Sequence, residues 1–150
     1  TIMATAHGAD ALGVDLAPNA IARARRKAAD RGSAAQFEVG DVLDLGRLGL
    51  TFDTVVDSGV FHVFDDEDRA RYVASLAAVT RPGAICYLMC FSDRQPGTMG
   101  PRRVTQDELI AAFRDGWAVA SITAETFDVN RFEHASQAQA WLATIERSAP

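Results

Sequence analysis

An unbroken apolar run, Ala84 to Phe91 (AICYLMCF), constrains the fold of this chain more than any other segment. A strand with one wet face alternates apolar and polar side chains, whereas a strand covered on both faces is apolar at every position. The run therefore predicts a strand in the middle of a parallel sheet. Because parallel strands are joined by long crossovers, usually helices, the sheet must belong to an α/β protein.

Segments with strand and helix patterns alternate along the rest of the chain. The other expected strands are 11–16, 35–39, 52–57, 117–129 and 140–146, the last of which could also be a helix. Helices are expected to end near Gly8, to run from Pro18 to Gly32, to begin at the acids Asp65 to Asp68 and stop at residues 81–83, and to begin at the capping box of Thr105 and Glu108. Strands that alternate with helices predict a doubly wound α/β sheet, and 150 residues fit a single domain with a sizeable core.

The charge balance argues against a nucleic-acid partner. Fifteen Lys and Arg against twenty Asp and Glu give a net charge of −5, which repels a phosphate backbone. The basic cluster at Arg23, Arg25, Arg26 and Lys27 fits the solvent-facing side of a helix better than a polyanion site. We therefore expect no binding to nucleic acid.

Cysteine placement and hydropathy indicate the compartment. Cys86 and Cys90 lie four residues apart on one predicted strand, too far apart to form a disulfide, so both are expected to be reduced core residues. No apolar stretch reaches the roughly 18 residues of a membrane span, and the start TIMATAHG lacks the features of a signal peptide. We expect a cytoplasmic protein without a membrane partner.

Three acids stand at the carboxyl ends of successive predicted strands. Asp15, Asp41 and Asp57 each lie at or just past such an end. Ligands of an open parallel sheet bind at this edge, and an acid after the second strand can accept both hydroxyls of a ribose. Asp15 and Asp41 could also be ordinary turn or capping residues. Because three successive strands end in the same way, we favour a ligand site to which all three acids contribute.

Four stretches of the sequence resemble the class I S-adenosylmethionine-dependent methyltransferases. They are GVDLAPNAIARARRKAADRG, FEVGDVLDL, FDTVVDSGVFHVF and VTRPGAICYLMCFSD. The resemblance implies a mostly parallel, Rossmann-like sheet with an antiparallel C-terminal strand. It also implies S-adenosyl-L-methionine as the cofactor and methyl transfer as the reaction.

The same resemblance assigns a role to each acid. Asp15 would bind the ribose and Asp41 would meet the amino group of adenine, whereas Asp57 would stand near the methionine part and the reaction centre. With their neighbours, the implied cofactor-binding residues are Asp15, Leu16, Asp41, Val42, Asp57, Ser58 and Gly59.

The resemblance begins at the second strand of the family. The family's first strand and its glycine-rich loop, which let the backbone approach the cofactor, have no counterpart in these residues. Residues 1–150 are therefore expected to form a single methyltransferase-like domain without this first βα unit. Such a domain would have a cofactor pocket open on one wall, and we expect it to bind the cofactor weakly.

His62 is the candidate catalytic residue. A neutral imidazole could take a proton from a hydroxyl, amine or thiol acceptor, or it could be a hydrogen-bonded residue that positions its loop. Phe61 and Phe64 flank it and could face the sulfonium and the substrate, or belong to the core. His7 and His134 have no Cys or acid at ligand spacing, so no metal site is expected.

The segment FSDRQPGTMGPRRVTQDEL is similar to the corresponding region of the thiopurine and thiol methyltransferase branch. This similarity implies a small-molecule acceptor that is uncharged or anionic. Arg102 and Arg103 could contact a carboxylate of such a substrate, although both could also be plain surface residues.

Two other functions stay open. An NAD-dependent oxidoreductase also places an acid after its second strand, so Asp15 does not exclude one, although no Tyr and Lys pair for hydride transfer is evident. A binding module that keeps the fold without catalysis is the other alternative. Methyl transfer to a small molecule is the favoured function, and the sequence does not indicate the oligomeric state.

Overall fold

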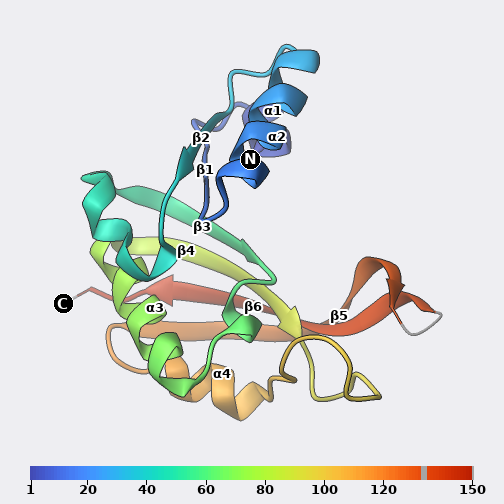
Figure 1. Ribbon diagram of the computed structural model, residues 1–150. Coiled ribbons are helices and arrows are strands. Elements are labelled where there is room, and N and C mark those ends of the chain that lie inside the picture. Colours follow the sequence, from blue (N-terminus) through green and yellow to red (C-terminus); the bar gives the residue numbers. More distant parts are fainter. Residues whose placement is uncertain (133–134, 150) are drawn as a thin grey trace. The chain divides into compact units, whose positions relative to one another are not determined.

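The computed structural model describes residues 1–132 and 135–149. Contacts divide the chain into two compact units, Thr1–Arg47 and Leu48–Pro150, each with its own sheet (Figure 1). Both units combine helices with parallel strands, so the predicted α/β class is confirmed. The single-domain organisation stays a prediction. Within the described ranges, no helix is long and apolar enough to cross a membrane.

The first unit contains a two-stranded parallel sheet and two α-helices. Its elements are α1 Ile2–Ala6, β1 Leu12–Asp15, α2 Pro18–Asp30 and β2 Gln36–Val39. The strands pair in register from Leu12 with Gln36 to Asp15 with Val39. Pro18 opens α2, and Gly32 follows its end with a φ of +59°, as the sequence predicts.

Gly13 in β1 lies close to two neighbouring side chains. A Cβ atom at this position would lie 2.6 Å from Oγ1 of Thr1 and 2.8 Å from Cδ1 of Phe37. Such distances are far inside van der Waals contact, so a larger residue would have to displace the Phe37 ring. Glycine is therefore required here by close packing.

The connection after β2 differs from the sequence prediction. No helix is expected between the predicted strands 35–39 and 52–57, but Val42–Leu48 form a 3₁₀ segment, η1, that is kinked at Asp44. Oδ1 of Asp41 accepts a hydrogen bond from the Leu43 N–H at 2.9 Å and so starts the turn. Short 3₁₀ turns are common connectors that carry no long apolar repeat, which explains why the sequence pattern does not identify this one.

The second unit is a four-stranded mixed sheet with helices on one face. Its elements are β3 Phe52–Ser58, η2 Phe61–Val63, α3 Asp66–Ala78, β4 Thr80–Phe91, α4 Gln106–Ala112, β5 Trp117–Phe132 and β6 Ala135–Arg147. The strand order is β3-β4-β6-β5; β3 and β4 are parallel, and β6 is antiparallel to both of its neighbours. The antiparallel C-terminal strand is thus confirmed, and the helix alternative for it is wrong.

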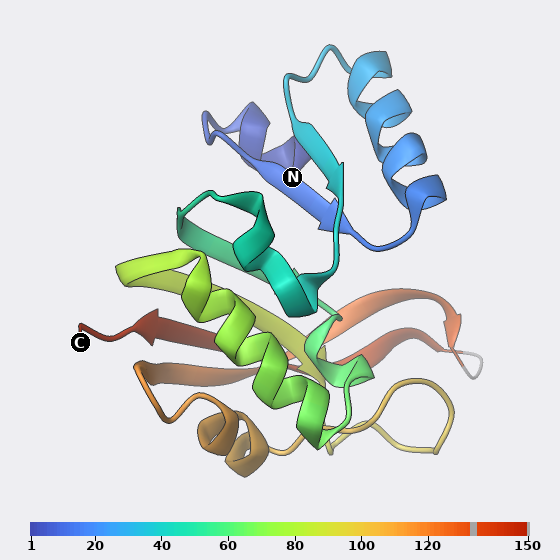
Figure 2. The same ribbon diagram turned by 60° about the vertical axis from the view of Figure 1, so that its left-hand side comes forward.

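The prediction that residues 84–91 are covered on both faces in a parallel sheet is wrong. β4 is central, but it pairs with parallel β3 on one side and antiparallel β6 on the other. Helices α3 and α4 lie on the same face of this sheet (Figure 2). Burial along β4 alternates accordingly: Tyr87 is 42% exposed and Ile85 and Met89 are half-buried, whereas Ala84, Cys86, Leu88 and Cys90 are buried.

Helix α3 ends earlier than the sequence predicts. It stops at Ala78 rather than at residues 81–83, and Arg81, Pro82 and Gly83 already belong to β4. The pairing with β3 jumps from Phe52–Thr80 to Thr54–Ile85, so these residues bulge out of the ladder. Proline cannot donate a ladder hydrogen bond, and Gly83 has a φ of +83°, which suits such an irregularity.

The predicted starts of α3 and α4 and the predicted state of the cysteines are confirmed. Oδ1 of Asp65 accepts the Asp68 N–H at 2.9 Å, and Thr105 and Glu108 form the capping box of α4. Both cysteines are free and buried. The core of the unit lies between the helices and the sheet, and its fully buried residues include Phe61, Leu76, Leu88, Leu109, Phe113 and Ile145.

Candidate active site

Asp15 and Asp41 lie at the same end of the first unit's sheet. Asp15 is the last residue of β1, Asp41 follows β2 closely, and the Gly40 N–H donates to the carbonyl oxygen of Asp15 at 3.1 Å. Each carboxylate is exposed and accepts one backbone N–H through Oδ1, from Ala17 at 2.8 Å and from Leu43 at 2.9 Å. These hydrogen bonds fix the direction of both side chains while leaving them accessible to a ligand.

Apolar side chains accompany the two acids. Leu16 is 69% exposed, Val39 is 44% exposed, and Val42 is half-buried. Carboxylates beside apolar surface suit a nucleoside, because hydroxyl and amino groups need acceptors while the purine ring needs an apolar neighbour. The residues of this unit therefore fit the adenosine part of the predicted cofactor.

Asp57, at the end of β3 in the second unit, is buried and holds the following turn. It is only 3% exposed, and its carboxylate accepts the Val60 N–H at 2.7 Å, the Phe61 N–H at 3.0 Å and the Tyr72 hydroxyl at 3.1 Å. Burial raises the pKa of Asp57, and the three hydrogen bonds oppose the rise. Its side chain thus fixes the backbone of the turn from within the protein.

Ser58 and Gly59 form the accessible part of this turn. Ser58 is exposed, and Gly59 has a φ of +90° and donates its N–H to the Met89 carbonyl at 2.9 Å. A Cβ atom on Gly59 would lie 3.3 Å from Nε2 of His62. The turn is therefore tied to β4 and packed against the histidine.

His62 is a buried, neutral residue that is engaged on both sides of its ring. Nδ1 accepts the Phe91 N–H at 2.9 Å, and the imidazole meets the Phe91 ring edge-on at 5.0 Å. Burial, followed by the positive charges of Arg69 and Arg103, lowers the pKa of His62 to about 4, against a hydrogen bond to the Gly59 backbone. This geometry favours the positioning role over the catalytic base, because the Nδ1 lone pair is occupied and the group is weakly basic.

The aromatic residues beside His62 differ in exposure. Phe61 is completely buried, which is the core position that the sequence allowed, and its ring lies 5.9 Å from that of Phe113. Phe64 is half-buried and packs on Tyr72 at 5.4 Å. Val63, between them, is 62% exposed. In this structure, Val63 and Phe64 can reach a ligand and Phe61 cannot.

Arg103 is the centre of the loop that follows β4, residues 92–104. Its guanidinium donates to five carbonyl oxygens at distances between 2.7 and 3.3 Å, those of Gln95, Pro96, Gly97, Met99 and Pro101. It also lies over the Phe91 ring, 5.4 Å from the centroid. These contacts occupy the group that the sequence allowed to bind a substrate carboxylate.

Arg102 is paired with acids of the chain. Its Nη1 lies 2.6 Å from Oδ1 of Asp66, and its Nη2 contacts Oε1 of Glu108. These hydrogen bonds raise the pKa of Arg102. The guanidinium groups of Arg102 and Arg103 are therefore both engaged in contacts within the chain.

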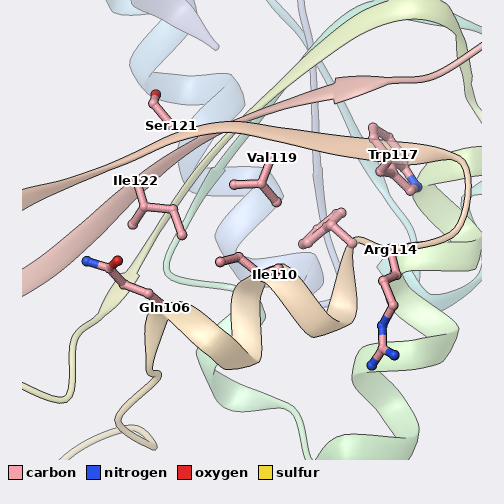
Figure 3. A pocket seen from close by; sticks show the side chains of 8 residues that line it. Gln106, Ile110, Arg114, Trp117, Val119, Ser121 and Ile122 are labelled. Atoms are coloured by element: carbon pink, nitrogen blue, oxygen red, sulfur yellow. The ribbon is translucent and has the colours of Figure 1, made fainter.

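A groove of about 460 Å³ lies between α4 and β5 (Figure 3). It is lined by Gln106, Ile110, Phe113, Arg114, Trp117, Val119, Ser121 and Ile122. Trp117 pairs with Arg147, next to the level of Ile85, and Ile122 lies level with Leu88 through Ala143, so the groove extends along this stretch of the sheet. None of the residues predicted to bind cofactor or substrate lines this groove. The remaining histidine of the sequence analysis, His134, lies outside the described residues.

The sequence interpretation missed three residues of this region. Tyr72 reaches Asp57, Arg69 is buried with its guanidinium 4.6 Å from the centre of the Phe61 ring, and Trp141 donates to Asp93 at 3.0 Å. A signal existed for Arg69, since it precedes Tyr72 and Leu76 at helical spacing and so shares their buried face. An arginine on an apolar stripe indicates a buried ion pair.

An α/β fold with exposed acids at the carboxyl ends of neighbouring parallel strands defines a Rossmann-like domain. Residues 1–83 match the methyltransferase domain family, which is more than half of the chain. The chain belongs to this family.

One curated relative and two solved structures illustrate the similarity. The 2-heptyl-1-hydroxyquinolin-4(1H)-one methyltransferase of Mycobacteroides abscessus is 33% identical over 119 residues, 77% of this chain. A structure from a study of the conversion of a disulfide bond into a thioacetal group during echinomycin biosynthesis is 32% identical, with a TM-score of 0.86, and the match covers 97% of this chain and 70% of that one.

A further structure shows the fold alone. Magnesium protoporphyrin IX methyltransferase of Synechocystis PCC 6803 with bound S-adenosylmethionine is 18% identical, with a TM-score of 0.72, over 99% of this chain and 64% of that one. The chain spans 52% of the length of the Mycobacteroides relative.

Proposed function

We propose that the chain carries the adenosine-binding and acceptor-facing parts of an S-adenosylmethionine-dependent methyltransferase that acts on a small molecule. The observation that carries this proposal is the pair of exposed, directed carboxylates of Asp15 and Asp41 at one sheet end, inside the segment that matches the family. Membership of the family supports methyl transfer over hydride transfer, which uses the same acid after the second strand.

When bound, S-adenosylmethionine supplies an activated methyl group on a sulfonium. In-line displacement then requires mainly alignment and exclusion of water from the protein. Asp15 would accept hydrogen bonds from the ribose hydroxyls, and Asp41 would accept one from the amino group of adenine. In the second unit, Asp57 and His62 hold the turn of Ser58 and Gly59, which by resemblance to the family would contact the methionine part of the cofactor.

The acceptor that fits best is apolar and uncharged. Its nucleophilic atom should lose its proton without a general base from the protein. Three charged groups at the end of β3 and after β4 are engaged: Arg102 by acids, Arg103 by carbonyls, and Asp57 by the turn. The side chains exposed there include Val63 and Met99, each 62% exposed. Because His62 has a pKa of about 4 and is a weak base, a thiol or an acidic hydroxyl is favoured over an alcohol.

The named relatives agree with such an acceptor. One acts on a hydroxyquinolinone with a heptyl chain, and the other belongs to chemistry on a disulfide. The first name contains a hydroxyl group and the second title a disulfide, so the chemistry that they name involves oxygen or sulfur. We therefore favour these two nucleophile types over amines.

Calorimetry with S-adenosylhomocysteine on the full-length protein tests the cofactor site. Asp15→Asn and Asp41→Asn should each weaken binding about tenfold, because each removes a charge-assisted hydrogen bond. Asp10→Asn, a nearby exposed acid before β1, is the matched control and should bind like the wild type. Binding of NAD in place of S-adenosylhomocysteine, or no response to either, would overturn the proposal.

A panel of acceptors tests the substrate class through release of S-adenosylhomocysteine. An alkyl thiol and 2-heptyl-1-hydroxyquinolin-4(1H)-one should be methylated. An alkyl alcohol and a thiol that carries a carboxylate should be poor acceptors. A preference for either of the latter two would contradict the proposed acceptor.

A further inference from the structure

Arg69 is a buried cation that joins two loops of the second unit. It lies on α3, is 4% exposed, and places its guanidinium 4.6 Å from the centre of the Phe61 ring. On its other side, Nη1 lies 3.1 Å from Oε1 of Glu108 in α4. The side chain therefore bridges the turn after β3 and the start of α4.

Glu108 also contacts residues where the loop after β4 ends. Oε1 of Glu108 also meets Arg102, and its Oε2 accepts the Thr105 N–H at 2.7 Å and the Thr105 hydroxyl at 3.1 Å. Arg102 and Thr105 stand at the end of loop 92–104. One carboxylate thus ties Arg69 to the point where this loop enters α4.

Phe61, whose ring contacts Arg69, is part of the turn after β3. Its N–H is bonded to Oδ2 of Asp57, its ring is fully buried beneath Arg69, and His62 follows it directly. The turn and loop 92–104 follow the carboxyl ends of the neighbouring parallel strands β3 and β4. Ligands of such sheets bind at these ends, so Arg69 links two segments that would frame one acceptor.

The ion pair is poorly explained as a source of stability. A buried ion pair is often no better than an apolar pair of similar volume, because both charges lose their hydration. Among the described residues, Nε and Nη2 of Arg69 have no hydrogen-bond partner, so part of the guanidinium is buried without compensation. A buried cation with unsatisfied nitrogens that contacts the turn after β3 through Phe61 and the first turn of α4 through Glu108 is better explained by the geometry that it imposes.

We propose that Arg69 is a positioning residue for the methyl acceptor: through Phe61 and Glu108 it holds the turn after β3 and loop 92–104 in one arrangement. The inference rests on the proposed function of this site. It assigns no contact between Arg69 and the substrate, and it predicts that loss of Arg69 impairs the acceptor and leaves cofactor binding intact.

The test uses three variants of the full-length protein. Arg69→Met removes the charge and keeps most of the volume, and Arg69→Lys keeps a cation that can reach Glu108. Arg71→Met is the matched control, because Arg71 lies on the same helix but is exposed and forms a local ion pair with Asp68 at 2.6 Å. The readouts are S-adenosylhomocysteine affinity, KM and kcat for 2-heptyl-1-hydroxyquinolin-4(1H)-one, melting temperature, and hydrogen exchange of residues 92–104.

Arg69→Met should raise the acceptor KM or lower kcat about tenfold and speed up exchange in loop 92–104, because misplaced binding groups cost rate steeply. Its S-adenosylhomocysteine affinity should stay at the wild-type level, and its melting temperature should fall only slightly, because Glu108 keeps its contact with Arg102. Arg69→Lys should restore much of the loss, and Arg71→Met should change nothing.

Wild-type kinetics and loop exchange in Arg69→Met would overturn the inference, and so would a loss of activity that only parallels a fall in melting temperature. Failure of the proposed function looks different: the wild type itself would then bind no S-adenosylhomocysteine and transfer no methyl group. In that case, exchange in loop 92–104 alone decides whether Arg69 couples the two segments.

Discussion

Nδ1 of His62 accepts the backbone N–H of Phe91 at 2.9 Å, which joins the turn after β3 to the last residue of β4. A side chain thereby replaces a backbone partner where the two strands diverge. The bond requires an unprotonated Nδ1, so the connection depends on the charge of the imidazole.

The stability of the protein should therefore fall on mild acidification. The pKa of His62 is about 4 in the folded chain against 6.5 when unfolded, so the unfolded state binds more protons between these values. The contribution of neutral His62 to the free energy of unfolding is fully present above pH 6.5. It is lost as the pH falls toward 4, and the total loss is about 3 kcal/mol. Urea unfolding between pH 7 and 4 measures it. His62→Gln should flatten the dependence, whereas His7→Gln, at an exposed position, should not.

Two substitutions of His62 separate positioning from base catalysis in the full-length protein. Gln can still accept the Phe91 N–H through its amide oxygen, but it cannot take a proton; Ala can do neither. If His62 positions the turn, Gln should retain most of the turnover and Ala should lose much more. If His62 is the base, both should lose about 10²–10⁴-fold. Rates with an alkyl thiol as acceptor measure the difference.

Tyr72→Phe should destabilise the second unit by about 2 kcal/mol, because it removes a buried hydrogen bond to a carboxyl group. The bond in question joins the Tyr72 hydroxyl to Asp57 at 3.1 Å. Tyr87→Phe is the matched control, since Tyr87 is 42% exposed on the other face of β4. Urea midpoints at pH 7 provide the comparison, and equal midpoints for the two variants would contradict the role of this bond.

Gly13→Ala should destabilise the first unit by about 1–3 kcal/mol through overpacking against Phe37. The added Cβ would lie 2.8 Å from the Phe37 ring. Phe37→Ala opens that space, so Gly13→Ala should cost less in the Phe37→Ala background than in the wild type. An additive double variant, measured by thermal unfolding, would show that the ring is not the obstacle.

Arg103→Lys should loosen loop 92–104, because an ammonium group cannot donate to five carbonyl oxygens at once. Amides of residues 95–100 should exchange faster in this variant. Arg94→Lys, in the same loop but with its guanidinium over Trp141 at 5.5 Å, is the control. Equal exchange in the two variants would mean that the carbonyl contacts do not hold the loop.

The sequence predicted local features well where one residue decides the geometry. Pro18 and Gly32 mark the limits of α2, and Asp65 and the pair Thr105–Glu108 mark helix starts, because caps and turns depend on a few adjacent residues. For the end of α3 the sequence predicts residues 81–83, which is too late, because Arg81 to Gly83 interrupt a helix and a strand equally well. Only the pairing with β3 shows that they form a bulge.

Asp15, Asp41 and Asp57 follow strands in the same way along the chain, so sequence alone treats them alike. The tertiary structure separates them, because burial depends on what packs above a residue: Asp15 and Asp41 are exposed, while Asp57 is covered and bonded to Tyr72 from α3. Order, spacing and residue type were thus enough for the α/β class and the family. Which carboxylates can meet a ligand, and which arginines are already paired, was decided by contacts between residues far apart in sequence.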